Sequence, residues 1–260
     1  MTAGRNRRLW IFDFDGTLSP IVPRRNAAFL HPACRALLRD LSRDPGGFVA
    51  VLSSRALSDL IFRVPVPKII LGGGSGAEWQ LPYGQRVGMA AAGTERAEAA
   101  RRSLLPLLAE FPRIPGVEVE DKYWSVAIHY RGVTPSDKQA VETLLKRLES
   151  MSDIRMLSGS CVQDIQVLYE HDKSLGVERL CRILRYDPTR GGILYAGDDE
   201  NDAIAMRWVI ARKGAAVSVG GRARVPGALH VADPVGLARA VRRLAGIVDG
   251  PAGGDGSGVP

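Results

Sequence analysis

Apolar stretches alternate with stretches of helical period at both ends of the chain. Near the N-terminus, residues 9–14, 48–52 and 68–71 are apolar and predict strands, and the segments between them predict helices over 31–43 and 55–62. The same rhythm returns later, with helices expected at 173–184, 201–211 and 235–247 and strands at 192–196 and 215–219. Apolar strands that alternate with helices indicate a parallel sheet covered on both faces.

The middle of the chain follows a different pattern. Residues 78–81 and 85–88 flank a Pro-Tyr-Gly turn and predict a hairpin. Beyond it, two stretches have helical period, and four alternate between apolar and polar residues as half-buried antiparallel strands do. The helices are expected at 94–111 and 137–148, and the strands at 117–121, 125–130, 154–157 and 162–169.

These patterns predict an α/β protein with a doubly wound parallel sheet, a Rossmann-type core. Residues 1–82 and 168–247 form this core, and residues 83–167 form an inserted α+β domain with helices on one side of an antiparallel sheet. Residues 248–260 are rich in Gly and Pro and are predicted to be disordered.

One predicted strand of the inserted domain has a polar face. Ser125, Ala127, His129 and Arg131 alternate with apolar residues, which we expect to pack on the helices of that domain. The polar face, with Asp164 on another strand, is either a substrate-binding surface or an ordinary solvated sheet face.

The composition excludes several classes of protein. Apolar residues make up 45% of the 260 residues, but no apolar run approaches the ~18 residues of a membrane-spanning helix, and the run after the basic start is too short for a signal peptide. We expect a cytoplasmic protein that does not bind membranes. Cys34, Cys161 and Cys181 are scattered, predict neither a disulfide framework nor a zinc site, and are expected to be buried.

The formal net charge is +7. Such a charge is compatible with nucleic-acid binding or with anionic small substrates. The cations are dispersed and are not interleaved with aromatic residues, so we attribute the charge to an arginine-rich composition and expect no nucleic-acid partner.

Two aspartates, Asp13 and Asp15, stand at the end of the first predicted strand, in the sequence DFDGTL. Residues i and i+2 of an extended segment point the same way, so both carboxylates are expected on one side of the strand end. They repel each other unless a cation or a proton lies between them. This pattern suits an acidic nucleophile, a neighbouring acid or base and a divalent metal ion.

Further polar groups follow other predicted strands or precede predicted helices. They are Ser53, Lys173 and the acidic run GDDEND, which holds Asp198, Asp199 and Asp202. Ligands of an open parallel sheet bind beyond the carboxyl ends of the strands. We therefore expect these groups to converge with the two aspartates of DFDGTL.

The chemistry of each group suggests a role in phosphate-ester hydrolysis. Asp13 can attack phosphorus, and Asp15 can protonate the leaving alkoxide and then activate water. Ser53 can contact a phosphate oxygen, or only cap the following helix. Lys173 can neutralise the charge of the phosphoryl oxygens.

Oxygen ligands for a hard cation come from both acidic motifs. Asp198, Asp13 and the carbonyl of Asp15 favour Mg²⁺, the usual metal of phosphate chemistry. Asp199 complements a helix N-terminus, and Asp202 can orient Lys173 or a metal-bound water.

The order DFDGTL, a strand ending in Ser, an isolated Lys and GDDEND resembles the haloacid-dehalogenase (HAD) superfamily of phosphatases. The inserted domain, between the Ser and Lys motifs, resembles the C2-type cap of that superfamily. Within it, the chain is most similar to trehalose-6-phosphate phosphatases, on the segments VLSSR, GSGAE, VEDKYWSVAIHYR, GDDEND and AVSVG.

The resemblance implies a Mg²⁺-dependent phosphatase that hydrolyses trehalose 6-phosphate through an aspartyl-phosphate, in one pathway with a trehalose-phosphate synthase. It implies phosphate contacts from Ser53 and Ser54. It also implies substrate contacts from Arg55, Glu78, Lys122, Arg131 and Asp164. For Arg55 the alternative is that it only pairs with an acid, and His129 is an open candidate.

The chain departs from the family pattern at several positions. Ser54 replaces a Gly, Ser75 replaces a His and Asn201 replaces a Thr. The family also has an EVR-like segment that holds sugar hydroxyls. In this chain Asp164-Ile165-Gln166 stands in its place, shifted by one residue. A phosphatase of sucrose phosphate or mannosyl-3-phosphoglycerate is therefore the alternative. A phosphomutase would need a second phosphate site. A nucleic-acid-binding protein on an inactive HAD fold is disfavoured because the acidic motifs would repel DNA phosphates.

Overall fold

The structure is a computed structural model that describes residues 7–22, 25–159, 161–168 and 171–247. The chain divides into two compact units. The first comprises Met1–Ala50, Pro65–Ile69 and Pro188–Pro260, and the second comprises Val51–Val64 and Ile70–Asp187. The predicted tail, 248–260, lies outside the described residues, and the predicted domain boundaries stay predictions.

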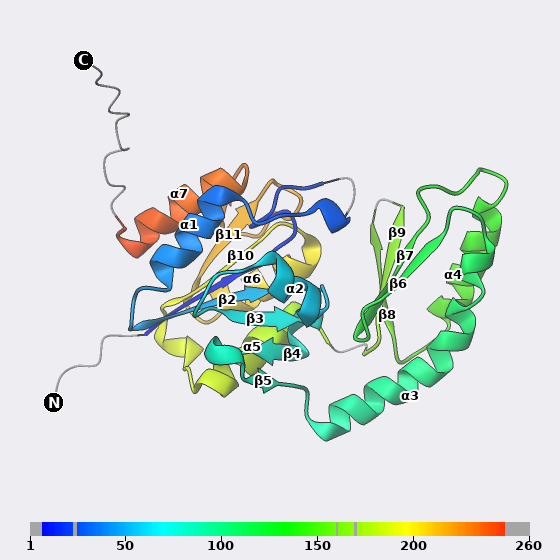
Figure 1. Cartoon of the computed structure of the whole chain (residues 1–260), viewed down its shortest axis with the longest axis horizontal. Helices are drawn as coiled ribbons and strands as arrows, with labels where there is room; N and C mark the ends of the chain where they lie inside the picture. The colour runs from blue at the N-terminus through cyan, green and yellow to red at the C-terminus, as the bar shows by residue number, and fades with distance from the viewer. Residues whose placement is uncertain (1–6, 23–24, 160, 169–170, 248–260) are drawn as a thin grey trace, which may run out of the picture. The chain divides into compact units, whose positions relative to one another are not determined.

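Parallel strands form the sheet of the first unit, in the order β12-β11-β10-β1 (Figure 1). They are β1 (Arg8–Phe12), β10 (Ile193–Gly197), β11 (Ala215–Val219) and β12 (Leu229–Val231). The first three are almost entirely buried, as expected for strands with helices on both faces. The sequence pattern misses β12, because its three residues are largely exposed and do not form an apolar run.

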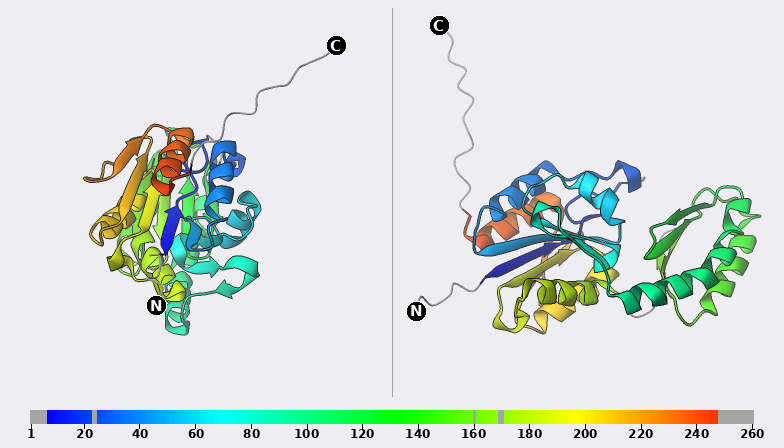
Figure 2. Two further views of the ribbon diagram at one scale, coloured as in Figure 1. Left: turned by 90° about the vertical axis from the view of Figure 1, so that its left-hand side faces the viewer. Right: turned by 60° about the horizontal axis from the view of Figure 1, so that its bottom comes forward.

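Helices cover both faces of this sheet. α1 (Pro32–Leu41) packs against α7 (Pro234–Ala245), and α6 (Glu200–Ile210) packs on β10 and β11. Figure 2 shows α1 and α7 on one face of the sheet and α6 on the other. This arrangement confirms the predicted doubly wound α/β pattern.

β2 (Gly47–Leu52) is shared, because its first four residues belong to the first unit and its last two to the second. In the second unit, α2 (Leu57–Arg63) is followed by β3 (Ile70–Gly73), β4 (Glu78–Gln80) and β5 (Arg86–Val87). These three strands are antiparallel, which confirms the predicted hairpin.

α5 (Lys173–Leu184) packs on the short turn Gly74–Gly76, which lies between β3 and β4. The approach is so close that a Cβ on Gly176 would lie 2.3 Å from the carbonyl oxygen of Ser75. Only glycine leaves room for this contact between two backbones.

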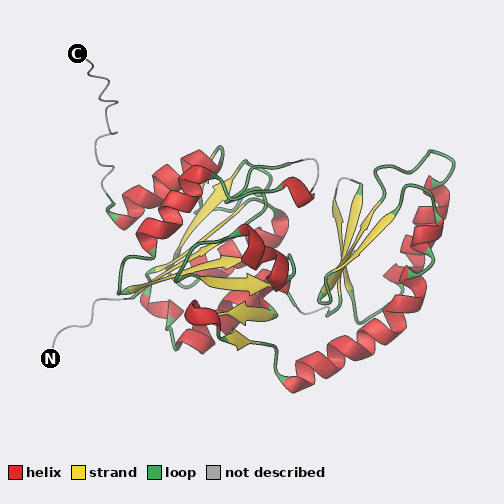
Figure 3. Cartoon of the chain, in the orientation of Figure 1, coloured by secondary structure: helices red, strands yellow, loops and turns green. Residues whose placement is uncertain are grey.

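An antiparallel sheet in the order β6-β7-β9-β8 forms the rest of the second unit. Its strands are β6 (Glu118–Asp121), β7 (Ser125–His129), β8 (Arg155–Gly159) and β9 (Val162–Gln166). α3 (Ala91–Leu108) and α4 (Lys138–Glu149) cover one face of it (Figure 3). Val126, Ile128 and Ile165 share a buried core with residues of both helices, which confirms the predicted apolar face.

No helix among the described residues is long and apolar enough to span a bilayer. Cys34 and Cys181 are buried as predicted. The prediction is wrong for Cys161, which is exposed because it lies in the turn between β8 and β9.

Candidate active site

Asp13 and Asp198 follow neighbouring parallel strands of the first unit. Phe12 pairs with Ala196, and the backbone N–H of Asp13 donates to the Ala196 carbonyl at 2.8 Å, so the two strand ends are held in register. Both aspartates are buried. β1 ends at Phe12, one residue before the first aspartate, rather than at residue 14.

A cluster of carboxylates forms at these strand ends. One oxygen each from Asp13, Asp198 and Asp202 lie within 4.8 Å of one another, and all three residues are buried. Among the described residues, this cluster does not include Asp15, which is half-buried. The fold thus brings together two acidic motifs that lie far apart in the sequence.

Asp202 holds the loop after β10 in place. Its Oδ1 accepts a hydrogen bond from the Tyr195 hydroxyl at 2.6 Å, and its Oδ2 accepts from the backbone N–H groups of Asp198, at 3.2 Å, and Asp199, at 3.4 Å. Asp199 is the N-cap of α6 and accepts from the Asp202 N–H, as its predicted place at a helix N-terminus requires. The predicted role of Asp202 toward Lys173 or a water stays a prediction.

The donor set of the cluster fits a hard divalent cation. Buried carboxylates this close repel one another, and a bound cation relieves that repulsion. Arg222 contributes one positive charge at 3.8 Å from Asp198, but its side chain is 59% exposed. The Asn201 Oδ1 atom, also near the start of α6, is buried without a hydrogen-bond donor among the described residues. Oxygen ligands of this kind suit Mg²⁺.

Ser53 follows β2 and is buried in the second unit. Its hydroxyl accepts from the Arg55 N–H at 3.1 Å, and its carbonyl accepts from the Ser75 N–H at 2.9 Å. α2 begins at Leu57 with Ala56 at the N-cap, so the alternative that Ser53 caps this helix is wrong. The chain turns for three residues before the helix begins, and Ser53 closes that turn instead. Ser54 is half-buried.

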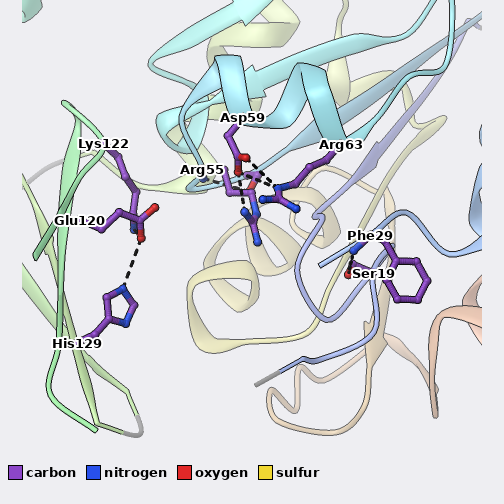
Figure 4. A network of polar contacts seen from close by, with 9 residues as sticks. Ser19, Phe29, Arg55, Asp59, Arg63, Glu120, Lys122 and His129 are labelled. Carbon is purple, nitrogen blue, oxygen red and sulfur yellow. Dashed lines mark hydrogen bonds and ion pairs between the residues drawn. The ribbon is translucent and has the colours of Figure 1, made fainter. Parts of the chain in front are cut away.

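Arg55 is one of the most buried charged residues, with 1% exposure. Its Nη1 donates to Asp59 Oδ2 at 2.6 Å, and Arg63 Nε donates to Asp59 Oδ1 at 2.9 Å (Figure 4). Burial alone would raise the pKa of Asp59, but the hydrogen bonds from Arg63 and Arg55 outweigh it and lower that pKa. Arg55 therefore does pair with an acid, and its contact with substrate stays a prediction.

Lys173 is the first residue of α5 and is buried. Asp172 caps this helix, with Oδ1 accepting from Ser174 N at 2.8 Å and Leu175 N at 3.1 Å. Because α5 and Ser53 both contact the Gly74–Gly76 turn, this turn connects the two elements that carry the predicted phosphate ligands. Their convergence with the carboxylate cluster stays a prediction.

The polar face of the β6-β7-β9-β8 sheet carries a partly buried ion pair. Lys122 Nζ lies 3.0 Å from Asp164 Oδ1. The same Nζ lies 4.0 Å from Glu120 Oε2, and His129 Nε2 lies 3.5 Å from that Glu120 oxygen (Figure 4). Glu120 was not among the predicted site residues, although its place two residues before Lys122 was a signal. Arg131 is exposed in the turn after β7.

Glu78 is half-buried at the start of β4. Its Oε1 accepts a hydrogen bond from the indole Nε1–H of Trp124 at 3.1 Å. Trp124 lies in the turn between β6 and β7, so this bond joins the two sheets of the second unit.

The parallel sheet with carboxylates at its strand ends and the separate α+β sheet have the fold of HAD-like proteins of known structure. A solved HAD-like hydrolase from B. subtilis superposes with a TM-score of 0.65 at 17% identity, covering 91% of this chain and 99% of that one. The C-terminal domain of C. albicans trehalose-6-phosphate phosphatase superposes with a TM-score of 0.72 at 21% identity, covering 94% of each chain.

The sequence model of the trehalose-phosphatase family matches residues 11–231, and the chain belongs to that family. Trehalose-phosphate phosphatase of Mycobacterium tuberculosis is 35% identical over 202 residues, which is 75% of this chain and 49% of the relative. The corresponding protein of Mycobacterium avium is 36% identical over 210 residues, 78% of this chain and 51% of the relative. The chain therefore spans about half the length of these relatives.

Proposed function

We propose that this chain is a phosphomonoesterase that hydrolyses trehalose 6-phosphate to trehalose and phosphate. The observation that carries the proposal is the buried cluster of Asp13, Asp198 and Asp202 in a member of the trehalose-phosphatase family. Burying several carboxylates at strand ends lowers the free energy of unfolding, so stability does not explain their presence. A role in phosphate chemistry does explain it.

The proposed reaction has two displacements at phosphorus. A carboxylate oxygen of Asp13 forms a bond to phosphorus while the bond from phosphorus to the sugar oxygen breaks, and Asp15 gives its proton to the departing oxygen. Asp15 then takes a proton from water as the water oxygen attacks phosphorus, and the bond to Asp13 breaks. The products are the free sugar and inorganic phosphate.

The acidic residues would hold Mg²⁺ through the carboxylates of Asp13 and Asp198 and the carbonyl of Asp15. When bound, the ion would neutralise charge on the phosphoryl oxygens. Lys173 adds a positive charge for the same purpose, and Ser53 and Ser54 contribute hydrogen bonds to the phosphate.

The sugar would be recognised by the polar face of the β6-β7-β9-β8 sheet. Lys122 and Asp164 are held close to each other there, and hydrogen bonds to charged groups discriminate strongly between hydroxyl patterns. Arg55 and Arg131 are the further candidates for direct contact with the sugar, and Glu78 is a candidate for its recognition by other means. A trehalose-phosphate synthase would supply the substrate and is the expected pathway partner.

A panel of sugar phosphates tests this proposal. Phosphate release should be fastest from trehalose 6-phosphate and much slower from sucrose 6-phosphate and mannosyl-3-phosphoglycerate. Because Asp164-Ile165-Gln166 departs from the family pattern, faster release from either of the latter two substrates would assign the chain to the alternative sugar. No release from any of them would overturn the phosphatase proposal.

A further inference from the structure

The turn between β6 and β7 is held from the side of α3. Arg101 Nη1 donates to Asp121 Oδ1 and to the Tyr123 carbonyl, both at 2.8 Å, and its guanidinium lies 4.9 Å from the centre of the Tyr123 ring. Tyr123 has a φ of 69°, a left-handed conformation that is costly for a residue with a side chain. The contacts with Arg101 hold the turn in this conformation.

The same turn is held from its other side by Trp124. This side chain is 8% exposed and lies directly over Gly74, where a Cβ would come within 2.7 Å of Trp124 Cδ1. Gly74 is itself fixed, since its N–H donates to the Arg55 carbonyl at 2.8 Å and its carbonyl accepts from His171 Nε2 at 2.9 Å. Trp124 therefore packs against a backbone segment that these hydrogen bonds hold in place.

Glu78 gives this contact its orientation. Packing of an aromatic ring on glycine is not directional, whereas the 3.1 Å hydrogen bond from Trp124 Nε1 to Glu78 Oε1 sets the rotation of the indole. The acceptor is a carboxylate, and a hydrogen bond to a charged acceptor is stronger than one between neutral groups.

The position of Trp124 determines that of Lys122. The Trp124 N–H donates to the Lys122 carbonyl at 2.9 Å, and the Lys122 N–H donates to the Ser125 carbonyl at 2.9 Å, so the turn is a single hydrogen-bonded unit. Lys122 in turn carries the ion pair with Asp164. A shift of the indole would therefore move the ammonium group that is proposed to meet the sugar.

We propose that Glu78 is a positioning residue, which fixes Lys122 and Asp164 for the sugar by holding Trp124. This inference rests on the proposed function, and it assigns Glu78 a role other than direct contact with the substrate. Loss of the Glu78 hydrogen bond leaves in place the backbone hydrogen bonds that join the Gly74–Gly76 turn to Ser53 and Arg55. The effect should therefore be confined to substrates that carry a sugar for the inserted sheet to bind.

Steady-state kinetics of Glu78→Ala, Glu78→Gln, Trp124→Phe and the double variant Glu78→Ala/Trp124→Phe test the proposal. Each of Glu78→Ala and Trp124→Phe should raise KM for trehalose 6-phosphate about tenfold, as expected for the loss of one hydrogen bond to a charged group, with a smaller change in kcat. Glu78→Gln keeps an acceptor oxygen and should remain within about threefold of wild type. p-Nitrophenyl phosphate, which has no sugar, should be hydrolysed equally by all.

The double variant distinguishes positioning from direct contact. If Glu78 acts through Trp124, the double variant should show the same tenfold change as either single one, because the second substitution removes nothing further. The proposal would be overturned if the rise in KM of the double variant equalled the product of the two single rises. A loss of activity toward p-nitrophenyl phosphate would also overturn it. Trp208→Phe, on α6 of the first unit, controls for the loss of a tryptophan elsewhere.

A second readout does not depend on activity. The hydrogen-exchange rate of the Trp124 indole N–H, identified by its absence from the spectrum of Trp124→Phe, should rise in Glu78→Ala and return toward the wild-type rate in Glu78→Gln. An unchanged rate in Glu78→Ala would also overturn the proposal. Failure of the proposed function would appear differently, as absence of sugar-phosphate hydrolysis by the wild-type chain.

Discussion

Asp198 occupies the space that a side chain on Gly16 would fill, since a Cβ built there would come within 2.2 Å of Asp198 Oδ2. Gly16 also has a φ of 80°, which favours glycine. The glycine of DFDGTL therefore serves the carboxylate cluster twice, by turning the chain after β1 and by leaving room for the carboxylate that follows β10.

Substitution of Gly16 by Ala should displace the Asp198 carboxylate and lower the affinity for Mg²⁺ by about 10- to 100-fold, the usual loss when a metal ligand loses its support. Isothermal titration with Mg²⁺ measures this. Gly84 has a φ of 89° and no atom within 4 Å of the place that a Cβ would take, so Gly84→Ala carries the backbone strain without the collision. Equal Mg²⁺ affinity in Gly16→Ala and Gly84→Ala would contradict the steric argument.

Asp202 should matter for stability as well as for the site. In Asp202→Asn, an amide N–H₂ replaces one oxygen and faces a hydroxyl or backbone donor that then loses its acceptor. Leaving such a buried donor unsatisfied should lower the free energy of unfolding by about 1–3 kcal/mol, measured by urea denaturation. Tyr195→Phe removes a donor and should cost about 1 kcal/mol. A wild-type midpoint for Asp202→Asn would show that these hydrogen bonds do not hold the loop.

His171 should make the stability of the second unit depend on pH. Burial lowers the pKa of His171 from its usual 6.5. The unfolded chain therefore binds the proton more readily, so the free energy of unfolding should fall as the pH drops below about 6.5, with a slope of at most ~1.4 kcal/mol per pH unit. The contribution of the neutral His171 to the free energy of unfolding is fully present above that pH.

His171→Gln keeps an N–H donor for the Gly74 carbonyl but does not titrate, so it should lose this part of the slope. Urea denaturation of both chains between about pH 5 and pH 7.5 measures the difference. His230→Gln, at an exposed position on β12, is the matched control and should keep the wild-type slope. A constant difference between wild type and His171→Gln across this range would contradict the prediction.

Much of the fold could be predicted because its signals are local. β1 and β10 are apolar runs, and α1 has an amphipathic period. Each of these patterns indicates, over a few neighbouring residues, which side chains are buried. β12 could not be predicted, because two of its three residues are exposed and the strand is defined by its pairing with β11. A short strand that is defined by backbone pairing does not need an apolar or alternating pattern of side chains, so its sequence does not indicate it.

The candidate site was predictable where residue type carries the chemistry. Asp13 and Asp198 were recognised as partners because parallel strands present their carboxyl ends at one edge. The contact between Trp124 and Glu78 was not predictable, because it depends on how a turn of one sheet meets the start of a strand in another. The apolar ring of Trp124 is also typical of a core residue, so the sequence does not indicate a role for the indole N–H.

Phosphate release from trehalose 6-phosphate by the wild-type chain and by Asp13→Asn, each with Mg²⁺ and with a chelator, tests the central claim most directly. The account predicts release by the wild type with Mg²⁺, loss of release on chelation, and no measurable release by a folded Asp13→Asn chain. Turnover by Asp13→Asn at the wild-type rate, or turnover that persists without any divalent cation, would contradict it.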